Sequence, residues 1–418
     1  MKKGRFFSVN DSLCTLCALA IAIAIAATLV APTTRASTEN KILPPPSGAY
    51  IGAYANFGPI EEDVSADKIH AFEILSGKKL AWAYFSDNWL KGEIIFPQAN
   101  FEACRAAHVV PYIRLSPWSE MIDKHADKIF SMQKVIDGRF DAALKIWAQN
   151  ARDFGDPIMI EFGPEVNGDW FPWNGRWNGG ATVDSYGDHA LADGPERFRD
   201  AYRHLIDLFR HEGAMNITWI LHVDSAGSPE AKWNFVKNYY PGDDYIDWIG
   251  VSVFGRQLPK NNWILFPTLL KAFMSQVLEA TSTKPILISE FGVIEDATDA
   301  NRKAIWLHQA FSSISKGMFK NVKGLTYWNS PGWLADRRAD FSINSSPLAL
   351  EAFRSEIASP FWISDLETTL NPTLNPTLNS TLNPTLNPTL TTTLTTALTT
   401  TLKTTVESPL ESHQQIMK

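Results

Sequence analysis

The chain has 418 residues, a formal net charge of −7 at pH 7, 45% hydrophobic residues and three cysteines. An acidic chain disfavours nucleic acid and anionic membrane surfaces as partners, because both are bound through basic surfaces. The sequence has no Cys/His cluster with zinc spacing and no glycine-rich phosphate loop, so we expect neither a metal nor another cofactor.

The first residues have the pattern of a secretory signal. Basic residues precede the apolar run Ser12–Val30, and Thr34–Ala36 has the small-x-small form of a cleavage site. We therefore expect residues 1–36 to be a signal peptide and the mature protein to be secreted or periplasmic. An uncleaved N-terminal membrane anchor is the alternative, because the apolar run is long. Cleavage would remove four basic residues and one acidic residue, which takes the net charge from −7 to −10, and would leave Cys104 as the single cysteine.

Residues 43–363 alternate between short apolar runs and amphipathic stretches. The predicted strands are Tyr50–Tyr54, Leu80–Phe85, Val109–Leu115, Pro157–Phe162, Ile217–Val223, Trp248–Phe254, Pro285–Phe291 and Gly324–Trp328. The predicted helices are Ala66–Leu75, Phe101–Ala107, Phe140–Asp153, Gly194–Glu212, Pro229–Asn238, Pro267–Thr281 and Asp299–Gly317. Strands that are apolar on both faces and alternate with helices indicate a parallel sheet. We predict a single (β/α)8 barrel, with a doubly wound open sheet as the alternative.

Residues 366–418 form a low-complexity segment rich in Thr, Leu, Asn and Pro. Leu recurs every fourth residue from Leu370 to Leu398, mostly separated by Asn-Pro-Thr or Thr-Thr-Thr. The repeated prolines forbid a regular helix in the first half. We expect a disordered tail or spacer, with a surface-attachment or glycosylated stalk as the alternative.

In a (β/α)8 barrel the chemistry sits at the carboxyl ends of the strands. Each predicted strand has a polar or aromatic residue at this point. These residues are Tyr54, Asn56, Asp87, Trp89, Arg114, Trp118, Glu161, Glu165, His222, Asp224, Phe254, Glu290, Trp328 and Asn329. The many tryptophans among them favour a binding site over a purely structural barrel.

The segment Glu161–Trp177 combines carboxylates, amides and three tryptophans, which suits a sugar. Aromatic rings stack on the C–H faces of pyranose rings, while amide, carboxylate and guanidinium groups bind the hydroxyl edges. The candidate substrate contacts are Asn167, Trp170, Trp173, Trp177, Trp118, Trp328, Arg114, His222 and Asp224. For each tryptophan a place in the core is the alternative, and His222 could equally be structural.

Glu165 and Glu290 end the fourth and seventh predicted strands and are the candidate catalytic residues. Glycoside hydrolysis needs two carboxyl groups, one that protonates the leaving oxygen and one that attacks the anomeric carbon or activates water. Glu161 lies four residues before Glu165, so in an extended strand the two would share a face. We expect Arg114 to pair with Glu161 in the barrel mouth, with a Glu161 that points outward to a helix Lys as the alternative.

Three segments resemble glycoside hydrolase family 26, which includes β-mannanases and mixed-linkage β-glucanases. Pro164–Trp173 resembles the family's His-Glu-Met-Asn-Gly-x-Trp-Phe-x-Trp segment, Tyr240–Gly250 its entry to the sixth strand, and Ile288–Gly292 its nucleophile strand. The likeness covers about residues 45–360 and implies a retaining (β/α)8 enzyme with Glu165 as acid/base and Glu290 as nucleophile.

The chain departs from this family pattern at three positions. Pro164 replaces the His before the acid/base, Glu161 replaces an Arg four residues before it, and Phe254 replaces a Tyr that supports the nucleophile. These departures concern substrate specificity more than the chemistry of the two Glu residues.

The sequence thus predicts a retaining endo-β-glycosidase that acts on a β-mannan, a mixed-linkage β-glucan or an exopolysaccharide. The partner is the polysaccharide alone, with no nucleic acid and no metal, and we expect a monomer. A catalytically silent carbohydrate-binding barrel and a hydrolase that trims the cell's own exopolysaccharide are the alternatives.

Overall fold

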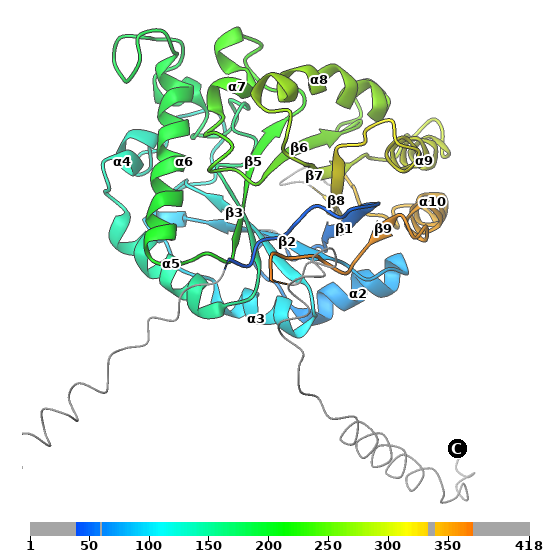
Figure 1. Ribbon diagram of the computed structural model, residues 1–418. Coiled ribbons are helices and arrows are strands. Elements are labelled where there is room, and N and C mark those ends of the chain that lie inside the picture. The colour runs from blue at the N-terminus through cyan, green and yellow to red at the C-terminus, as the bar shows by residue number, and fades with distance from the viewer. Residues whose placement is uncertain (1–38, 59–60, 333–338, 371–418) are drawn as a thin grey trace, which may run out of the picture.

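The computed structural model describes residues 39–58, 61–332 and 339–370. The predicted signal segment and residues 371–418 of the predicted tail lie outside these residues. Eight parallel strands close into a barrel surrounded by helices, which confirms the predicted (β/α)8 architecture (Figure 1). The barrel strands are β1 (Ala49–Tyr54), β2 (Trp82–Asn88), β3 (Val110–Ser116), β4 (Ile158–Phe162), β5 (Ile217–Asp224), β6 (Trp248–Phe254), β7 (Ile286–Gly292) and β8 (Val322–Trp328).

The barrel closes through β1. This strand pairs in parallel with β8 from Tyr50–Gly324 to Tyr54–Trp328, and its Ala53 pairs with Ala83 of β2. A short strand, β9 (Trp362–Ile363), also pairs with the start of β1. Most strand residues are buried, since one side faces the barrel interior and the other faces the helices.

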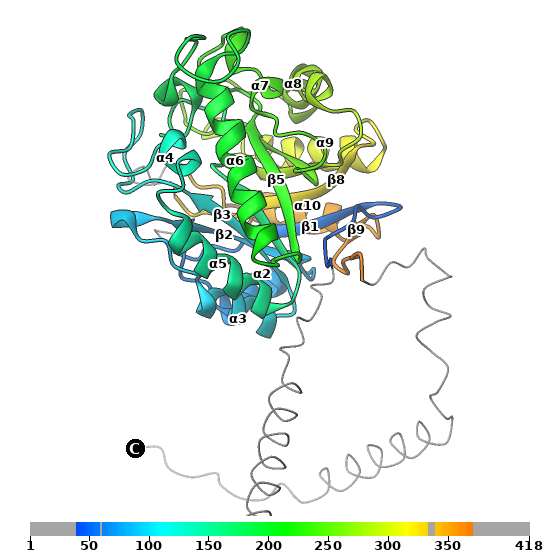
Figure 2. The same cartoon turned by 60° about the vertical axis from the view of Figure 1, so that its left-hand side comes forward.

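The helices form the outer layer (Figure 1). They are α2 (Ala66–Ser76), α3 (Gln98–Ala106), α4 (Met132–Ile136), α5 (Asp141–Phe154), α6 (Asp193–His211), α7 (Val236–Tyr239), α8 (Phe266–Ala280), α9 (Arg302–Ser315) and α10 (Pro347–Ile357). Figure 2 shows α6 beside β5, where Tyr202 of the helix donates a hydrogen bond to the carbonyl of Ile220 at 2.8 Å. No helix among the described residues is long and apolar enough to cross a membrane.

The predicted helix Pro229–Asn238 is wrong. The structure has a 3-10 turn at Lys232–Asn234, then an extended Phe235, and then the single turn α7. The side chain of Asn234 is buried and donates to the backbone carbonyls of Asn167 and Pro229. Side-chain hydrogen bonds of this kind compete with helix formation.

The folded domain is longer than the predicted range 43–363. Ile42 forms an antiparallel bridge with Thr368, and its backbone N–H donates to Thr218 Oγ1 at 2.7 Å. Residues 39–42 and 366–370 therefore pack against the barrel. Residues 366–370 of the predicted tail segment are thus in contact with the folded domain.

The large ring of Trp82 packs in the amino-terminal part of the barrel interior, edge-on to Tyr50. Trp82 is fully buried, and its indole N–H donates to Thr326 Oγ1 at 2.9 Å. Gly52 and Gly324 supply the space, because a Cβ atom at either position would lie within 3 Å of the Trp82 ring. This packed floor leaves the carboxyl end of the barrel for polar side chains.

We predict that Gly52→Ala destabilises the fold by about 1–3 kcal/mol, because a Cβ at Gly52 would lie 2.0 Å from Trp82 Nε1. Urea unfolding followed by tryptophan fluorescence measures this change. The double variant Gly52→Ala/Trp82→Phe is the control, since a smaller ring makes room and the two effects should then be less than additive. A single variant with the stability of the parent protein would contradict this account.

Candidate active site

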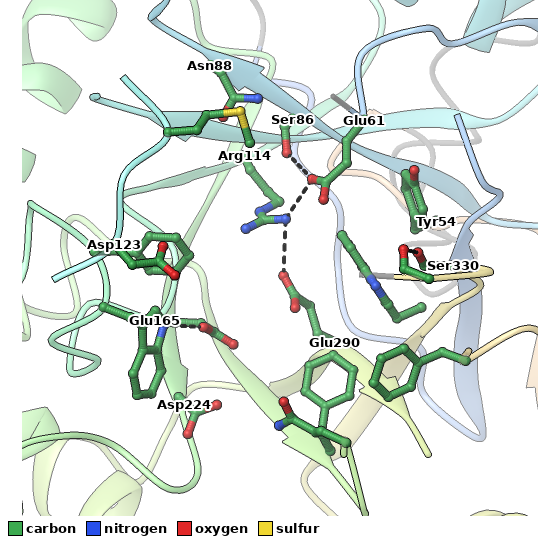
Figure 3. Close-up of a pocket in the computed structure, with 18 of the residues that line it drawn as sticks. Tyr54, Glu61, Ser86, Asn88, Arg114, Asp123, Glu165, Asp224, Glu290 and Ser330 are labelled. Atoms are coloured by element: carbon green, nitrogen blue, oxygen red, sulfur yellow. Dashed lines mark hydrogen bonds and ion pairs between the residues drawn. The ribbon is translucent and has the colours of Figure 1, made fainter. Parts of the chain in front are cut away.

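A cavity of about 760 Å³ opens at the carboxyl ends of the strands (Figure 3). Its walls carry five carboxyl groups, contributed by Glu61, Asp123, Glu165, Asp224 and Glu290. Aromatic rings line the cavity as well, and these belong to Tyr54, Trp118, Trp170, Phe171, Phe254, Trp328 and Phe341. Its size and its mixture of apolar and polar lining are typical of a ligand site.

Glu165 reaches the cavity from a turn. Strand β4 ends at Phe162, and both Gly163 and Glu165 have positive φ angles, of 61° and 50°. The expectation that Glu165 continues the strand face of Glu161 is therefore wrong. A non-glycine residue with positive φ is strained, and such residues concentrate at functional sites. Trp170 Nε1 donates to Glu165 Oε2 at 2.8 Å and fixes the carboxyl group.

Glu290 enters the cavity through a bulge in β7. Along β6, Val251 pairs with Ile288 but Ser252 pairs with Glu290, so Ser289 is an extra residue in β7. As a result, the side chains of Ser289 and Glu290 both point into the barrel. The Ser289 hydroxyl lies 2.7 Å from the Tyr112 hydroxyl, and the Tyr84 hydroxyl donates to Glu290 Oε1 at 3.0 Å. Bulges that re-aim a side chain are common beside active sites.

Arg114 of β3 lies between two carboxyl groups. Its Nη1 donates to Glu61 Oε2 at 3.0 Å and lies 3.5 Å from Glu290 Oε1 (Figure 3). Its Nε is 3.9 Å from Glu161 Oε1, which is too far for a hydrogen bond. The expected Arg114–Glu161 ion pair is thus present as a long contact, while the shorter contacts of Arg114 are with Glu61 and Glu290.

Glu161 is fully buried inside the barrel, which excludes an outward orientation. It accepts hydrogen bonds from Tyr84 at 2.6 Å and Tyr112 at 2.5 Å, and His222 Nδ1 lies 2.9 Å away. Burial alone would raise the pKa of Glu161, but the His222 charge and hydrogen bond lower it below its ordinary value. Burial alone would lower the pKa of His222, but Glu161 raises it. The two residues therefore form a buried ion pair.

Among the described residues, Glu161, His222 and Glu290 form one group whose ligand atoms lie within 4.8 Å of one another, as a metal site would require. Both His222 nitrogens already have protein partners, Glu161 at 2.9 Å and Ser252 at 2.8 Å. Glu161 accepts two further hydrogen bonds, from Tyr84 and Tyr112. The group is thus satisfied by the protein itself, which makes it a poor fit for an ion.

Seven of the predicted site residues line the cavity, namely Glu165, Glu290, Trp170, Trp118, Trp328, Arg114 and Asp224. Trp118 is held by a hydrogen bond from its indole N–H to Asn88 Oδ1 at 2.8 Å. Trp328 stacks on Tyr54 with ring centroids 4.4 Å apart and lies below the Arg114 guanidinium. Trp170 contacts Glu165, and both Trp170 and Trp118 contact Phe171, so these rings form the cavity wall near Glu165. Trp328 forms the cavity wall near Arg114 and Glu290.

Four predicted substrate contacts lie outside the cavity lining. Trp173 is 1% exposed and stacks beneath Phe171, and its indole N–H donates to the Pro164 carbonyl. His222 is buried in its pair with Glu161, while Asn167 is buried against the backbone of Asp224. Trp177 donates to the Asp169 carbonyl away from the cavity. In the structure Trp173, Trp177 and Asn167 hold the surrounding loops and His222 holds Glu161, so for these four residues substrate contact stays a prediction.

Sequence reasoning missed several polar groups of the site, of which Glu61 and Tyr84 contact the residues already described. Glu61 lies in the loop after β1, and its carboxylate accepts hydrogen bonds from Ser86 at 2.6 Å and Arg114 at 3.0 Å. Tyr84 lies in the middle of β2 and was hidden within an apolar run. The two-residue alternation of Trp82, Tyr84 and Ser86 along β2 could have indicated an inward face.

The model of glycosyl hydrolase family 26 matches residues 81–321, which is more than half of the chain. The chain belongs to this family. It is 26% identical over 318 residues to Endoglucanase H of Acetivibrio thermocellus, which covers 75% of this chain and 31% of that protein. It is 29% identical over 126 residues to a Beta-1,3-xylanase of Alcaligenes sp., which covers 30% of this chain and 22% of that protein. The chain thus spans less than a third of the length of these relatives.

A solved structure of a Cellulomonas fimi endo-beta-1,4-mannanase double mutant has the same fold. Its TM-score is 0.53 at 16% identity, and the match covers 76% of this chain and 72% of that one. At this identity the likeness concerns the fold alone. The resemblance to family 26 that the sequence motifs indicated is therefore confirmed by the family match.

Two departures from the family 26 pattern are matched by other residues of this chain. Glu161 occupies the position of an Arg, and Arg114 supplies a guanidinium from the neighbouring strand, where the two residues pair in register. Phe254 lines the cavity without a hydroxyl, and Tyr84 contacts Glu290 instead. In this chain Arg114 thus places a cation and Tyr84 a phenol beside Glu290, while Pro164 has no such counterpart.

We predict that Arg114→Met lowers the free energy of unfolding by about 3 kcal/mol, because it leaves buried carboxyl groups without their cation. Thermal and urea unfolding at neutral pH measure the loss. Arg105→Met is the matched control, since Arg105 forms exposed ion pairs with Glu102 and Asp156 that contribute less than about 1 kcal/mol. Equal stability of the two variants would contradict the role given to Arg114.

Proposed function

We propose that this family 26 protein is a retaining endo-β-glycosidase that cleaves a neutral β-linked polysaccharide. The observation that carries the proposal is that Glu165, from the turn after β4, and Glu290, from β7, face one cavity that is also lined by aromatic rings. The aromatic rings provide stacking surfaces for sugar rings on each side of the scissile bond. The acidic lining suits an uncharged polymer better than an anionic one.

In the proposed mechanism Glu290 acts as the nucleophile. Its carboxylate attacks the anomeric carbon while Glu165 protonates the leaving glycosidic oxygen, which gives a glycosyl ester on Glu290. Glu165 then removes a proton from a water molecule, which attacks the same carbon and releases Glu290. Two inversions at one carbon retain its configuration.

The environment of Glu290 sets the acid side of the expected pH profile. Burial raises the pKa of Glu290 to about 7; Arg114 opposes this shift, and the charge of Glu165 adds to it. Since the nucleophile must be ionised, activity requires a pH near or above this value.

We predict that kcat/KM falls as the pH drops through about 7, because Glu290 then becomes protonated. Arg114→Met should move this acid limb to higher pH, since Arg114 lowers the pKa of Glu290. Initial rates across the pH range measure both limbs. An acid limb that stays in place in the variant would contradict the assigned contact.

For the substrate we propose a β-glucan. The similarity to the endoglucanase extends over three quarters of this chain. The mannosidase of Caldalkalibacillus mannanilyticus matches over 33% of it. Mannan and bacterial exopolysaccharides are the alternative substrates.

A reducing-end assay on mixed-linkage glucan, mannan, β-1,3-xylan and bacterial exopolysaccharides tests this proposal. We predict that Glu165→Gln and Glu290→Gln each reduce polymer hydrolysis by at least about a thousandfold. Glu102→Gln, on the outer face of α3, is the matched control and should keep full activity. Proton NMR of the first product should show the β anomer. Hydrolysis of none of these polymers, or an α product, would contradict the proposal.

We further propose that the protein acts outside the cytoplasm as a monomer. The support is the signal-like composition of residues 1–36. Mass measurement of the secreted protein tests cleavage after Ala36, and light scattering tests the oligomeric state.

A further inference from the structure

A third carboxyl group, that of Asp224, lies beside Glu165 and has no part in the double displacement. Asp224 ends β5, is buried and lines the cavity on the same side as Glu165 (Figure 3). The two carboxyl groups lie on the same side of the cavity, near enough for a side-chain hydrogen bond if one of them is protonated. Asp224 Oδ1 also accepts a hydrogen bond from the Ala226 backbone at 2.6 Å.

The backbone holds this pair together. Asn167, two residues after Glu165, donates from Nδ2 to the Asp224 carbonyl at 2.8 Å and accepts at Oδ1 from the Asp224 backbone N–H at 2.7 Å. The Val166 N–H donates to the His222 carbonyl at 3.1 Å. The turn that carries Glu165 is thereby fastened to the end of β5 at two points. The contact between the carboxyl groups is thus built into the fold.

Two carboxyl groups can form a hydrogen bond with each other only when one of them holds a proton. We propose that Asp224 is a positioning residue for the acid/base, and that it shares one proton with Glu165 and so keeps the catalytic acid loaded. This inference rests on the proposed function and specifies how its proton donor is maintained.

The charges around the pair favour retention of this proton. Burial raises the pKa of Asp224 well above its usual range, and the neighbouring charges of Glu165 and Glu290 add to the shift. His222 faces the pair from β5, but its charge is already paired with Glu161. Arg114 contacts Glu61 and Glu290, and the Trp170 N–H bonds Glu165 alone.

The proton balance of the proposed reaction fits a shared proton. In the first step the pair gives its proton to the leaving oxygen, and both carboxyl groups become anionic. Repulsion between the two adjacent anions then favours uptake of a proton by the pair from the attacking water. The proton taken from that water restores the original pair, so Asp224 undergoes no net change.

The first test is kinetic. Asp224→Asn replaces the partner with an amide that can donate to an ionised Glu165, so the basic limb of the kcat/KM profile should move about one pH unit or more downward. Hydrolysis of polymer at neutral pH should fall roughly tenfold or more, whereas a dinitrophenyl glycoside, which needs no acid, should change little. Asp224→Ala should shift the limb in the same direction, and Asp123→Asn, which removes a different cavity carboxyl group, should not.

The second test does not depend on activity. Infrared titration in a Glu290→Gln background measures protonated carboxyl groups at neutral pH without the raised carboxyl group of Glu290. Asp87, whose pKa burial raises to about 7, contributes equally in every variant, so difference spectra between variants remove its signal. Asp224→Asn and Glu165→Gln should each abolish the same protonated carboxyl signal, and Asp123→Asn should preserve it. Melting temperatures verify that each variant is folded.

The outcomes separate this inference from the proposed function. Persistence of the protonated signal in Asp224→Asn or Glu165→Gln, or an unmoved basic limb in both Asp224 variants, would overturn the shared proton. Loss of the signal in both variants supports the shared proton, even if the parent protein hydrolyses no polymer in the screen. That last result would overturn the proposed function alone.

Discussion

The crowding of carboxyl groups at one end of the barrel is the constraint on which this site depends. Glu61, Glu161, Glu165, Asp224 and Glu290 lie in or directly below one cavity, and ionised carboxylates in a poorly solvated space repel one another. The protein meets this cost in three different ways. Glu161 is neutralised by His222, Glu61 and Glu290 share the Arg114 guanidinium, and Glu165 and Asp224 lie in hydrogen-bond contact.

These three solutions prepare the carboxyl groups for different tasks. The ion pair with His222 and the phenols of Tyr84 and Tyr112 leave Glu161 ionised and inaccessible, so it acts as a fixed charge at the centre of the barrel. Glu290 lies above it and contacts both Tyr84 and Arg114. A group that must ionise to react is thus placed between a buried anion and a cation, and the balance between them sets its pKa.

The opposite charges on β3 and β4, those of Arg114 and Glu161, belong to the same balance of anions and cations. Arg114 and Glu161 are register partners on neighbouring strands, so a guanidinium on either strand reaches the same point of the barrel mouth. In this chain the guanidinium comes from β3. The carboxylate on β4 then needs its own cation, and His222 on the next strand provides it.

Strand periodicity explains which parts of the site could be predicted from the sequence. The strands follow from apolar runs, and Glu165, Glu290 and Asp224 follow from the rule that barrel chemistry lies at strand ends. The orientation of these side chains could not be predicted, because it depends on local breaks in the period of two. Ser289 is an extra residue in β7, and Glu165 adopts a left-handed backbone, so neither follows the alternation of its strand.

The same limit explains the tryptophans and Asn167. Composition places Trp170, Trp173 and Trp177 in one loop, but only Trp170 lines the cavity. Trp173 lies under Gly163, where a Cβ would approach its ring to 2.9 Å, so its bulk shapes the turn that carries Glu165. Asn167 fastens that turn to β5. Much of this conspicuous segment therefore holds one strained residue in place, since a left-handed Glu165 persists only when its surroundings determine its conformation.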